Sequence, residues 1–450
     1  MLTAGSHTAH KSIAPCLVPA DVAVLTSGRV MKLKRITSIA TVCGAIVATL
    51  AVTAGNVSAA VAVRGTFTPV DPVRILDTRD GTGVADQHPG PLGAGKVIEL
   101  DVTGVADVPE TGVGAVVLNV TVTEAANRGF VTVYPCGNAR PLASNLNFIA
   151  GVNAANQVTA KVGRDGRVCL FTSAQTQLVA DVSGWYADDF ASVPGFWYHP
   201  LTAARIVDTR DGTGLGDRAV APLAAGEVLA VTVPGAGGVP ADDDVRAVTM
   251  NVTVADAVSA GYITVFPCDL PRPGVSNVNF DPANPTVSNL ATVRPSSTGQ
   301  VCFFASVSTN LIVDVQGYFS PRADVTFTSV GPVRILDTRD GTGVVGSRVS
   351  RPARGTVIEL QVAGENGVPL DASAVLLNVT ITEASGPGFV TAWPCGRPRP
   401  LASFLNFVRG VDRANLTPVR IGSDGKVCLY VHEGTQVIAD LNGYYTTVAT

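Results

Sequence analysis

One ten-residue phrase occurs three times in this sequence, at intervals the size of a domain. It reads Arg-Ile-Leu-Asp-Thr-Arg-Asp-Gly-Thr-Gly at 74–83 and at 334–343, and the copy at 205–214 differs only by Val207. The copies start 131 and 129 residues apart. Such an interval is long enough for one domain. The sequence therefore predicts three tandem copies of a single module.

The first sixty residues read as a leader. A basic stretch, Met31–Arg35, precedes an apolar run from Ile36 to about Ala54 and then the small-residue site Val57–Ala59. This order predicts a secretory signal peptide over 31–59, with residues 1–30 as a start-site artefact. The alternative is an uncleaved anchor, because the apolar stretch is long enough to span a bilayer. We expect a secreted, extracellular protein, associated with the cell wall or free of it.

Six cysteines lie beyond the leader, two in each copy of the module. The two members of a pair are 33, 34 and 33 residues apart. In a secreted chain this spacing predicts one disulfide per module, worth about 3–4 kcal/mol in the chain-entropy model. A zinc site does not fit, because two cysteines with no histidine in register cannot supply four ligands. The cysteines are Cys136, Cys169, Cys268, Cys302, Cys395 and Cys428.

The charge balance argues against two classes of partner. Removing residues 1–59, which hold five basic residues and one acidic residue, leaves 27 basic and 35 acidic residues and a net charge of −8. Nucleic acids and anionic membranes need clustered positive charge on the protein. We therefore expect no nucleic-acid partner and no membrane association after cleavage. No motif calls for a cofactor or a metal.

Hydrophobic patterning favours strands throughout. Val, Thr, Gly and Pro are abundant, and the first copy contains about eight short apolar or alternating segments separated by turn signals. We predict an all-β chain of three jelly-roll-like β-sandwich modules. The modules are placed at 64–187, 195–320 and 324–446. The short connections contain Pro194 and Pro321, which indicates a stiff string of separate modules.

The repeated phrase is the strongest candidate binding site. It places two cations and two anions within seven residues, beside a flexible turn. One interpretation is a groove that grips a polar ligand, such as a sugar or a carboxylate, through arginine. Two alternatives are an internal salt-bridge network and a calcium loop, although the calcium spacing is incomplete. The candidates are Arg74, Asp77, Arg79, Asp80, Arg205, Asp208, Arg210, Asp211, Arg334, Asp337, Arg339 and Asp340.

A further aspartate recurs within the apolar final strand of each copy. Asp181, Asp314 and Asp440 occupy this position. A carboxylate in such a strand needs a partner, and the arginines of the phrase are the natural ones. This favours the internal network.

Two asparagine positions also recur. Asn119, Asn251 and Asn378 fit both a glycosylation acceptor and a strand whose polar side faces outward; we favour the strand. Asn147, Asn279 and Asn406 each precede a phenylalanine. An amide beside an aromatic ring suits either a sugar site or a turn next to the core.

Catalytic signals are weak. The histidines beyond the leader are His88, His199 and His432, and none is in register with another. No nucleophile elbow, zinc-protease or phosphate-loop motif is present. An acid recurs at Glu124, Asp256 and Glu383, but the sequence assigns it no second carboxylate for a glycosidase pair. We expect a protein that is not an enzyme.

These segments together resemble a repeat module of actinobacterial secreted and cell-surface proteins. The resemblance rests on the phrase at 72–79, the strand 116–124, the segments 134–136 and 144–148, and the ending 180–186, and it covers all three copies. It implies an accessory module with no settled activity, in some proteins joined to wall hydrolases or proteases. The third copy departs at Phe404, where the others have asparagine.

We therefore expect a secreted, non-catalytic cell-envelope protein of three modules, with a binding or a structural, adhesive role; the expected ligand is cell-wall or extracellular polysaccharide. Three weak sites in a row would gain avidity. The alternatives are a secreted polysaccharide hydrolase and a purely structural surface component. The sequence leaves the oligomeric state open.

Overall fold

The computed structural model describes residues 64–85, 89–347 and 349–447. The predicted artefact at 1–30 and the signal peptide at 31–59 lie outside these residues. The described part of the chain contains 24 strands, two short 3-10 turns and no α-helix. The prediction of an all-β chain is confirmed.

Module 1 is a sandwich of two four-stranded antiparallel sheets. One sheet has the order β1-β8-β3-β6 and the other β2-β7-β4-β5. Eight strands wound alternately between two sheets in this order form a jelly roll. The strands are β1 (Phe67–Asp77), β2 (Val97–Asp101), β3 (Val113–Thr123), β4 (Gly129–Pro135), β5 (Leu146–Phe148), β6 (Ala154–Lys161), β7 (Arg167–Thr172) and β8 (Gln177–Ala187).

Modules 2 and 3 repeat this order strand for strand. A single residue pair between β9 and β17 joins their first sheets into one eight-stranded sheet. Module 2 comprises β9 (Trp197–Asp208), β10 (Val228–Thr232), β11 (Ala247–Ala255), β12 (Gly261–Pro267), β13 (Val278–Phe280), β14 (Val287–Val293), β15 (Gln300–Ala305) and β16 (Asn310–Ser320). Module 3 comprises β17 (Val325–Asp337), β18 (Val357–Gln361), β19 (Ala372–Thr382), β20 (Gly388–Pro394), β21 (Leu405–Phe407), β22 (Arg413–Arg420), β23 (Lys426–Val431) and β24 (Gln436–Thr447).

Each module has an apolar core of its own between its two sheets. Strand β3 shows why: Val116, Leu118, Val120 and Val122 alternate along it and all enter the core of module 1. Three self-contained cores explain why each copy of the sequence carries a full set of alternating strands.

The modules also share a fourth cluster, which we call the central aromatic cluster. Each module contributes two rings to it, one from its first strand and one from its last. The inter-module ring pairs Phe67–Phe319, Tyr186–Phe327 and Tyr198–Tyr445 have centroids 4.3, 4.4 and 4.6 Å apart. Offset or tilted aromatic pairs at these distances are favourable.

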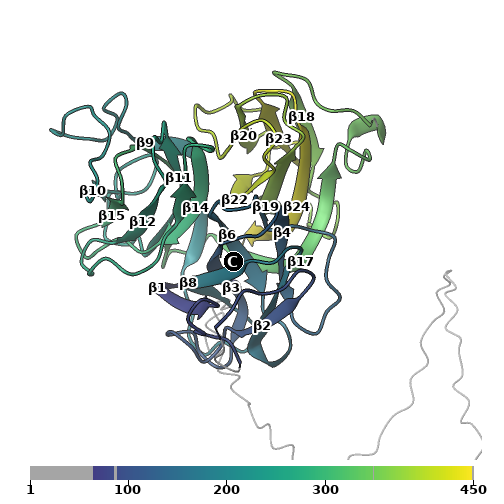
Figure 1. Cartoon of the computed structure of the whole chain (residues 1–450), viewed down its shortest axis with the longest axis horizontal. Coiled ribbons are helices and arrows are strands. Elements are labelled where there is room, and N and C mark those ends of the chain that lie inside the picture. The colour runs from purple at the N-terminus through teal and green to yellow at the C-terminus, as the bar shows by residue number, and fades with distance from the viewer. Residues whose placement is uncertain (1–63, 86–88, 348, 448–450) are drawn as a thin grey trace, which may run out of the picture. The chain divides into compact units, whose positions relative to one another are not determined.

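Six asparagines form a second shared feature, the asparagine ring. In Figure 1, β6, β14 and β22, one from each module, meet near the middle of the picture. On these strands Asn156, Asn289 and Asn415 donate Nδ2–H to Oδ1 of an asparagine in another module, at 2.9, 2.8 and 3.0 Å. The acceptors are Asn378, Asn119 and Asn251 in that order.

Two expectations are thereby corrected. Asn119, Asn251 and Asn378 do not face outward, because the polar side of their strand is covered by a neighbouring module and they are at most 6% exposed. The modules are also not a string of separate units, since the described residues from 64 to 447 belong to one compact unit. A polar strand face and a short linker look the same in sequence whether solvent or another module covers them.

Candidate functional site

The repeated phrase of module 1 forms an ion network at the end of β1. Arg79 donates from Nε and Nη2 to the two carboxylate oxygens of Asp77, at 2.8 and 2.6 Å. Arg74 bridges two carboxylates, donating to Asp77 Oδ2 at 3.2 Å and to Asp181 Oδ1 on β8 at 2.9 Å. Both aspartates are buried. The network therefore fastens the first strand to the last.

Modules 2 and 3 contain the same network. Arg205 bridges Asp208 and Asp314, and Arg334 bridges Asp337 and Asp440. Arg210 and Arg339 hold their aspartates through two side-chain hydrogen bonds each, as Arg79 does. These contacts fit the internal-network interpretation of the phrase.

Module 1 departs from the pattern at one atom. Arg74 Nη2 donates to the backbone oxygen of Gly274 in module 2, at 3.0 Å. In the other modules the equivalent Nη2 atom reaches the second oxygen of the buried carboxylate, at 3.5 and 3.3 Å. Oδ2 of Asp181 consequently has no hydrogen-bond partner among the described residues. In module 1, the Nη2 atom of this arginine thus forms a hydrogen bond to module 2 in place of one to its own buried aspartate.

The pKa values of the two buried aspartates in each network are shifted in opposite directions. Burial raises the pKa of Asp181 to about 6, although Arg74 acts to lower it. Burial likewise raises the pKa of Asp314 and Asp440. Burial also acts to raise the pKa of Asp77, but the hydrogen bonds and charge of Arg79 outweigh it and hold that pKa below its usual value.

The last carboxylate of the phrase lies apart from the others. Asp80 Oδ1 accepts the backbone N–H of Thr82 at 2.9 Å, and Asp211 and Asp340 make the same turn contact. Gly83 closes the turn at φ +69, where a side chain would collide with the backbone of Ile75. The calcium-loop interpretation is disfavoured, because both oxygens of Asp77 already accept guanidinium donors.

Arg74 and Arg79 open onto a groove where module 1 meets module 2, whereas Asp80 borders a different hollow. The structure therefore does not bring the four candidates of module 1 into one site. The groove consists of a hollow of ≈ 440 Å³ and an adjoining one of ≈ 310 Å³ that share three lining residues. We call it the seam groove; the shared residues are Asn153, Tyr262 and Asn279.

One further arginine of each module has a defined place in the structure that was not predicted from the sequence. Arg140, Arg272 and Arg399 lie over aromatic rings of β7, β15 and β23, with Cζ 3.8, 4.2 and 3.7 Å from the centroids of Phe171, Phe304 and Tyr430. All three arginines are exposed, and Arg272 lines the seam groove. The signal was an Arg-Pro pair four residues before a recurring serine, at 140, 272 and 399.

The recurring asparagines before phenylalanine have unequal surroundings. Asn279 lines both hollows of the seam groove and donates to Ser276 Oγ at 3.2 Å. Asn147 contacts Ser144 of its own module, whereas Asn406 donates to Ser288 of module 2. Only the middle position of the three is thus placed by the structure on the described groove.

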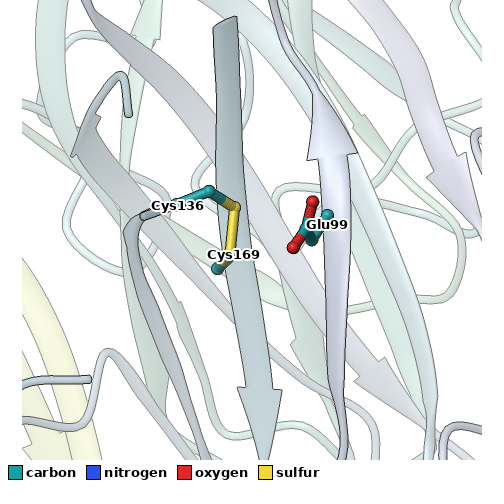
Figure 2. A group of neighbouring side chains, drawn as sticks. All are labelled: Glu99, Cys136 and Cys169. Atoms are coloured by element: carbon teal, nitrogen blue, oxygen red, sulfur yellow. A yellow bond between two sulfur atoms is a disulfide. The ribbon is translucent and has the colours of Figure 1, made fainter. Parts of the chain in front are cut away.

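The three predicted disulfides are confirmed, each within one module: Cys136–Cys169, Cys268–Cys302 and Cys395–Cys428. Figure 2 shows Glu99, on the neighbouring strand, beside the disulfide of module 1. This group has the residue types of a metal site, but a disulfide lacks the thiolates that bind metal. We therefore assign it no metal.

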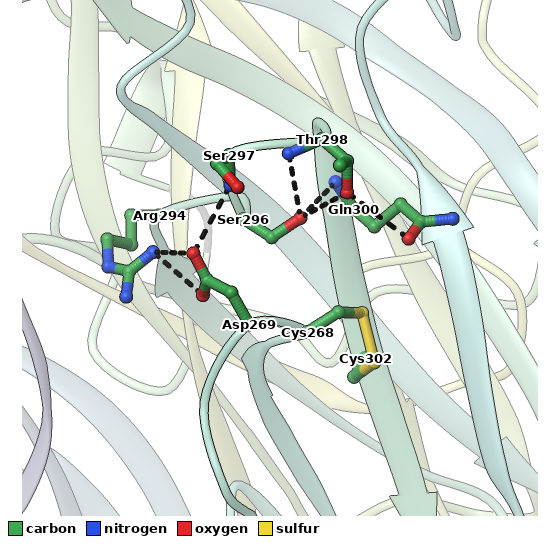
Figure 3. The surroundings of a disulfide bond; sticks show 8 residues. All are labelled: Cys268, Asp269, Arg294, Ser296, Ser297, Thr298, Gln300 and Cys302. Carbon is green, nitrogen blue, oxygen red and sulfur yellow. Dashed lines mark hydrogen bonds and ion pairs between the residues drawn. A yellow bond between two sulfur atoms is a disulfide. The ribbon is translucent and has the colours of Figure 1, made fainter.

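Module 2 differs at the turn after its first cysteine. Asp269 accepts two hydrogen bonds from Arg294, at 3.0 and 3.2 Å, and one from the backbone of Ser297 (Figure 3). Arg294 also donates Nε–H to Asp71 of module 1, at 2.7 Å. The altered turn thus supports an ion-pair network that joins module 2 to module 1.

No family model and no curated protein matches the chain. Two solved structures are similar at low scores. One, titled "The Triple Jelly Roll Fold and Turret Assembly in an Archaeal Virus", shares 11% identity over 86% of this chain and 91% of its own, with a TM-score of 0.17. The other, from Sulfolobus Turreted Icosahedral Virus, shares 10% identity over 86% and 92%, with a TM-score of 0.16. At such scores the likeness carries no argument.

Within the described residues, no helix has the length and apolar character needed to cross a membrane.

Proposed function

We propose that this protein is a secreted, non-catalytic component of the cell envelope that binds polysaccharide. The observation that supports this most directly is the seam groove. Its lining combines guanidinium groups, an aromatic ring, amides and hydroxyls. These are groups that hold polar, ring-shaped ligands without reacting with them.

The alternative of a hydrolase repeated three times has less support. The exposed carboxylates of module 1 nearest each other along a strand are Glu99 and Asp101, and both pair with Arg167, at 3.4 and 2.6 Å. Strand pairing identifies the equivalent positions in module 2. Glu99 pairs with Cys169 as Ala230 pairs with Cys302, so Ala230 and Thr232 take the places of Glu99 and Asp101. In module 3 these positions hold Glu359 and Gln361. A catalytic pair used three times would need both carboxylates in every module.

Three disulfides support the proposed extracellular location, because such bonds persist in oxidising compartments. The alternative of a purely structural surface component draws on a different feature, the packing of three modules around shared aromatic and asparagine clusters. A compact three-module body suits display as well as binding.

The proposal is tested with the secreted full-length protein. It is mixed with insoluble wall polysaccharide from a Gram-positive bacterium, and the bound fraction and any released reducing ends are measured. We expect saturable sedimentation with the polymer and no release of reducing ends above the buffer control. Release that grows with time and with protein concentration would favour the hydrolase, and no sedimentation with the wall polysaccharide would favour the purely structural component.

A further inference from the structure

The seam groove has an excess of positive charge on its larger hollow. Arg74, Arg79 and Arg272 line this hollow, and its described lining contains no carboxylate. The two aspartates that pair with Arg74 are buried below it. We infer that the seam groove binds an extended acidic glycan, one whose sugar rings carry carboxylates, and that each molecule binds one such chain. This inference rests on the proposed polysaccharide-binding function and names its site and ligand class.

Two of the arginines have donors to spare. Arg272 stacks on Phe304, and its one hydrogen bond among the described residues is a long contact, 3.4 Å, to the hydroxyl of Tyr262. Among the described residues no carboxylate forms an ion pair with it. Arg79 is 42% exposed and uses Nε and Nη2 on Asp77, which leaves Nη1 without an acceptor among the described residues. Guanidinium donors of this kind match the two oxygens of a carboxylate.

The remaining lining favours a sugar over an acidic peptide. Tyr262 is half-buried and borders both hollows, so its ring can pack against the apolar face of a sugar. Asn153 and Asn279 lie beside it in both hollows and offer amides to ring hydroxyls. Because the two hollows share these three residues, the groove is longer than one sugar ring, and a chain of sugars fits it better than a single unit.

The second hollow has one acidic residue. Asp281 lies on its lining, and Oδ1 accepts the backbone N–H groups of Ala283 and Asn284, at 2.7 and 3.1 Å. One carboxylate oxygen is therefore turned toward its own loop. We place the carboxylates of the ligand in the larger hollow and its hydroxyls in the smaller one.

The same groove is altered at the other two module contacts. The position of Gly274 holds Leu142 in module 1 and Leu401 in module 3, in the repeated segment Arg-Pro-x-x-Ser. Those leucines are 84% and 85% exposed, and a Cβ built on Gly274 would meet nothing within 4 Å. A leucine at 274 would therefore fit without disturbing the fold, and because Gly274 lines the larger hollow it would add an apolar side chain to the lining.

Two other positions of the groove also hold, at the other module contacts, residues that suit an acidic glycan less well. Tyr262 corresponds to Phe130 and Phe389, which lack the hydroxyl. Asn153, the residue before β6, corresponds to Thr286 before β14 and to Asp412 before β22. A carboxylate at Asp412 repels an acidic ligand at its contact. Only the contact between modules 1 and 2 thus has glycine, tyrosine and asparagine together, which is why we expect one chain per molecule rather than three.

The test is calorimetric titration of the full-length protein with oligomers of galacturonate, mannuronate and hyaluronan. The methyl ester of the galacturonate oligomer and polyglutamate serve as the neutral and the peptide comparisons. We expect one site per molecule for at least one uronate oligomer, weaker binding at higher salt, and at least tenfold weaker binding of the ester and of polyglutamate.

Matched variants locate the site. Gly274→Leu and Tyr262→Phe introduce residues that other modules already have, so both are expected to unfold at the wild-type temperature. Gly274→Leu should weaken binding at least tenfold, and Tyr262→Phe severalfold. Leu142→Gly, the reverse change at another contact, should leave the affinity unchanged.

The outcomes separate the two proposals. Binding of three oligomers per molecule, equal affinity in Gly274→Leu, tighter binding of polyglutamate or indifference to esterification would each overturn the inference. If no uronate oligomer binds while wall polysaccharide still sediments the protein, the seam-groove inference is wrong and the proposed function stands. If no polysaccharide binds in either assay, both are wrong.

Discussion

At the scale of single residues, the recurring feature of each module is a pair of buried aspartates that form ion pairs with partly exposed arginines. In each module one arginine bridges two buried aspartates, for example Arg74 between Asp77 and Asp181. The aspartate held by two arginines has a lowered pKa, and the one on the last strand has a raised pKa. The network that joins the repeated phrase to the last strand thus contains two carboxylates whose pKa values are shifted in opposite directions.

The first prediction concerns pH. Because the folded pKa of Asp181 is about 6, above its ordinary value of 3.8, the folded state binds more protons than the unfolded state between these pH values. Its stabilising effect is therefore complete below about pH 4 and is lost as the pH rises through 6. Asp77 behaves oppositely: its contribution is present above 3.8 and is lost as the pH falls through its lowered folded pKa.

We compare the free energy of unfolding of Asp181→Asn with that of the wild type at two pH values. Relative to the wild type, the variant should be more stable at pH 7.5 than at pH 5.0 by about 1 kcal/mol, because the wild type loses the contribution of protonated Asp181 over this range. Urea unfolding of the wild type and the variant at both pH values measures this difference. Asp101→Asn, at an exposed position on β2, is the control. A variant whose effect is the same at both pH values would contradict the raised pKa.

The second prediction concerns the bridging arginine. Arg74→Met keeps most of the side-chain volume but leaves Asp181 buried without its partner and removes one donor from Asp77. Because Arg74 is 27% exposed, we expect a loss of about 2–3 kcal/mol in the free energy of unfolding, below the cost for a fully buried pair. Chemical denaturation measures it, and Arg64→Met, at an exposed ion pair, should change stability by less than about 1 kcal/mol.

At the scale of elements, the last strand of each module contributes both to the core of its own module and to the central aromatic cluster. Gly184, Gly317 and Gly443 recur in this strand, and a Cβ at each would collide with the ring of Phe67, Tyr198 or Phe327. These rings belong to the central aromatic cluster. Glycine is needed here because each ring packs closely against the last strand of its own module, which places that ring in the central aromatic cluster.

The third prediction concerns the asparagine ring. Asn289→Ala removes the donor to Asn119 Oδ1 and the acceptor of the Gln157 backbone N–H, both buried and in module 1. Each buried group left without a partner costs about 1–3 kcal/mol, so we expect a loss of about 2–4 kcal/mol. Denaturant unfolding checks this against Asn138→Ala, an exposed asparagine. A loss similar to that of the control would mean that water replaces the ring contacts.

At the scale of the whole molecule, three similar modules meet through equivalent residues. Each supplies two rings to the central aromatic cluster and two asparagines to the asparagine ring. The contacts run from each module to the next and return to the first, as in a cyclic trimer joined into one chain.

The fourth prediction follows from that arrangement. Module 1 expressed alone, as residues 64–195, would expose Phe67, Tyr186 and Asn119, which are now at most 6% exposed. We expect it to self-associate, with a trimer as the favoured state, and to unfold at a lower temperature when diluted. Light scattering after size exclusion measures the mass. A monomer as stable as the full-length protein would show that the inter-module contacts contribute little.

The sequence by itself determined the repeat, the jelly-roll strands and the three disulfides. These depend on local signals: alternation along strands such as β3, turn glycines such as Gly83, and cysteines at one fixed spacing. It also indicated that Asp181 needs a cationic partner, because an apolar strand cannot hold a free carboxylate.

Only the tertiary structure decided which polar residues are buried between modules and which line a groove. Asn119 has the same alternating pattern whether its strand faces water or another module. Tyr262 and Gly274 become significant only beside Arg74, which lies 188 and 200 residues earlier in the chain. The physical reason is that alternation specifies two faces of a strand, whereas the partner of each face depends on how complete modules pack against one another.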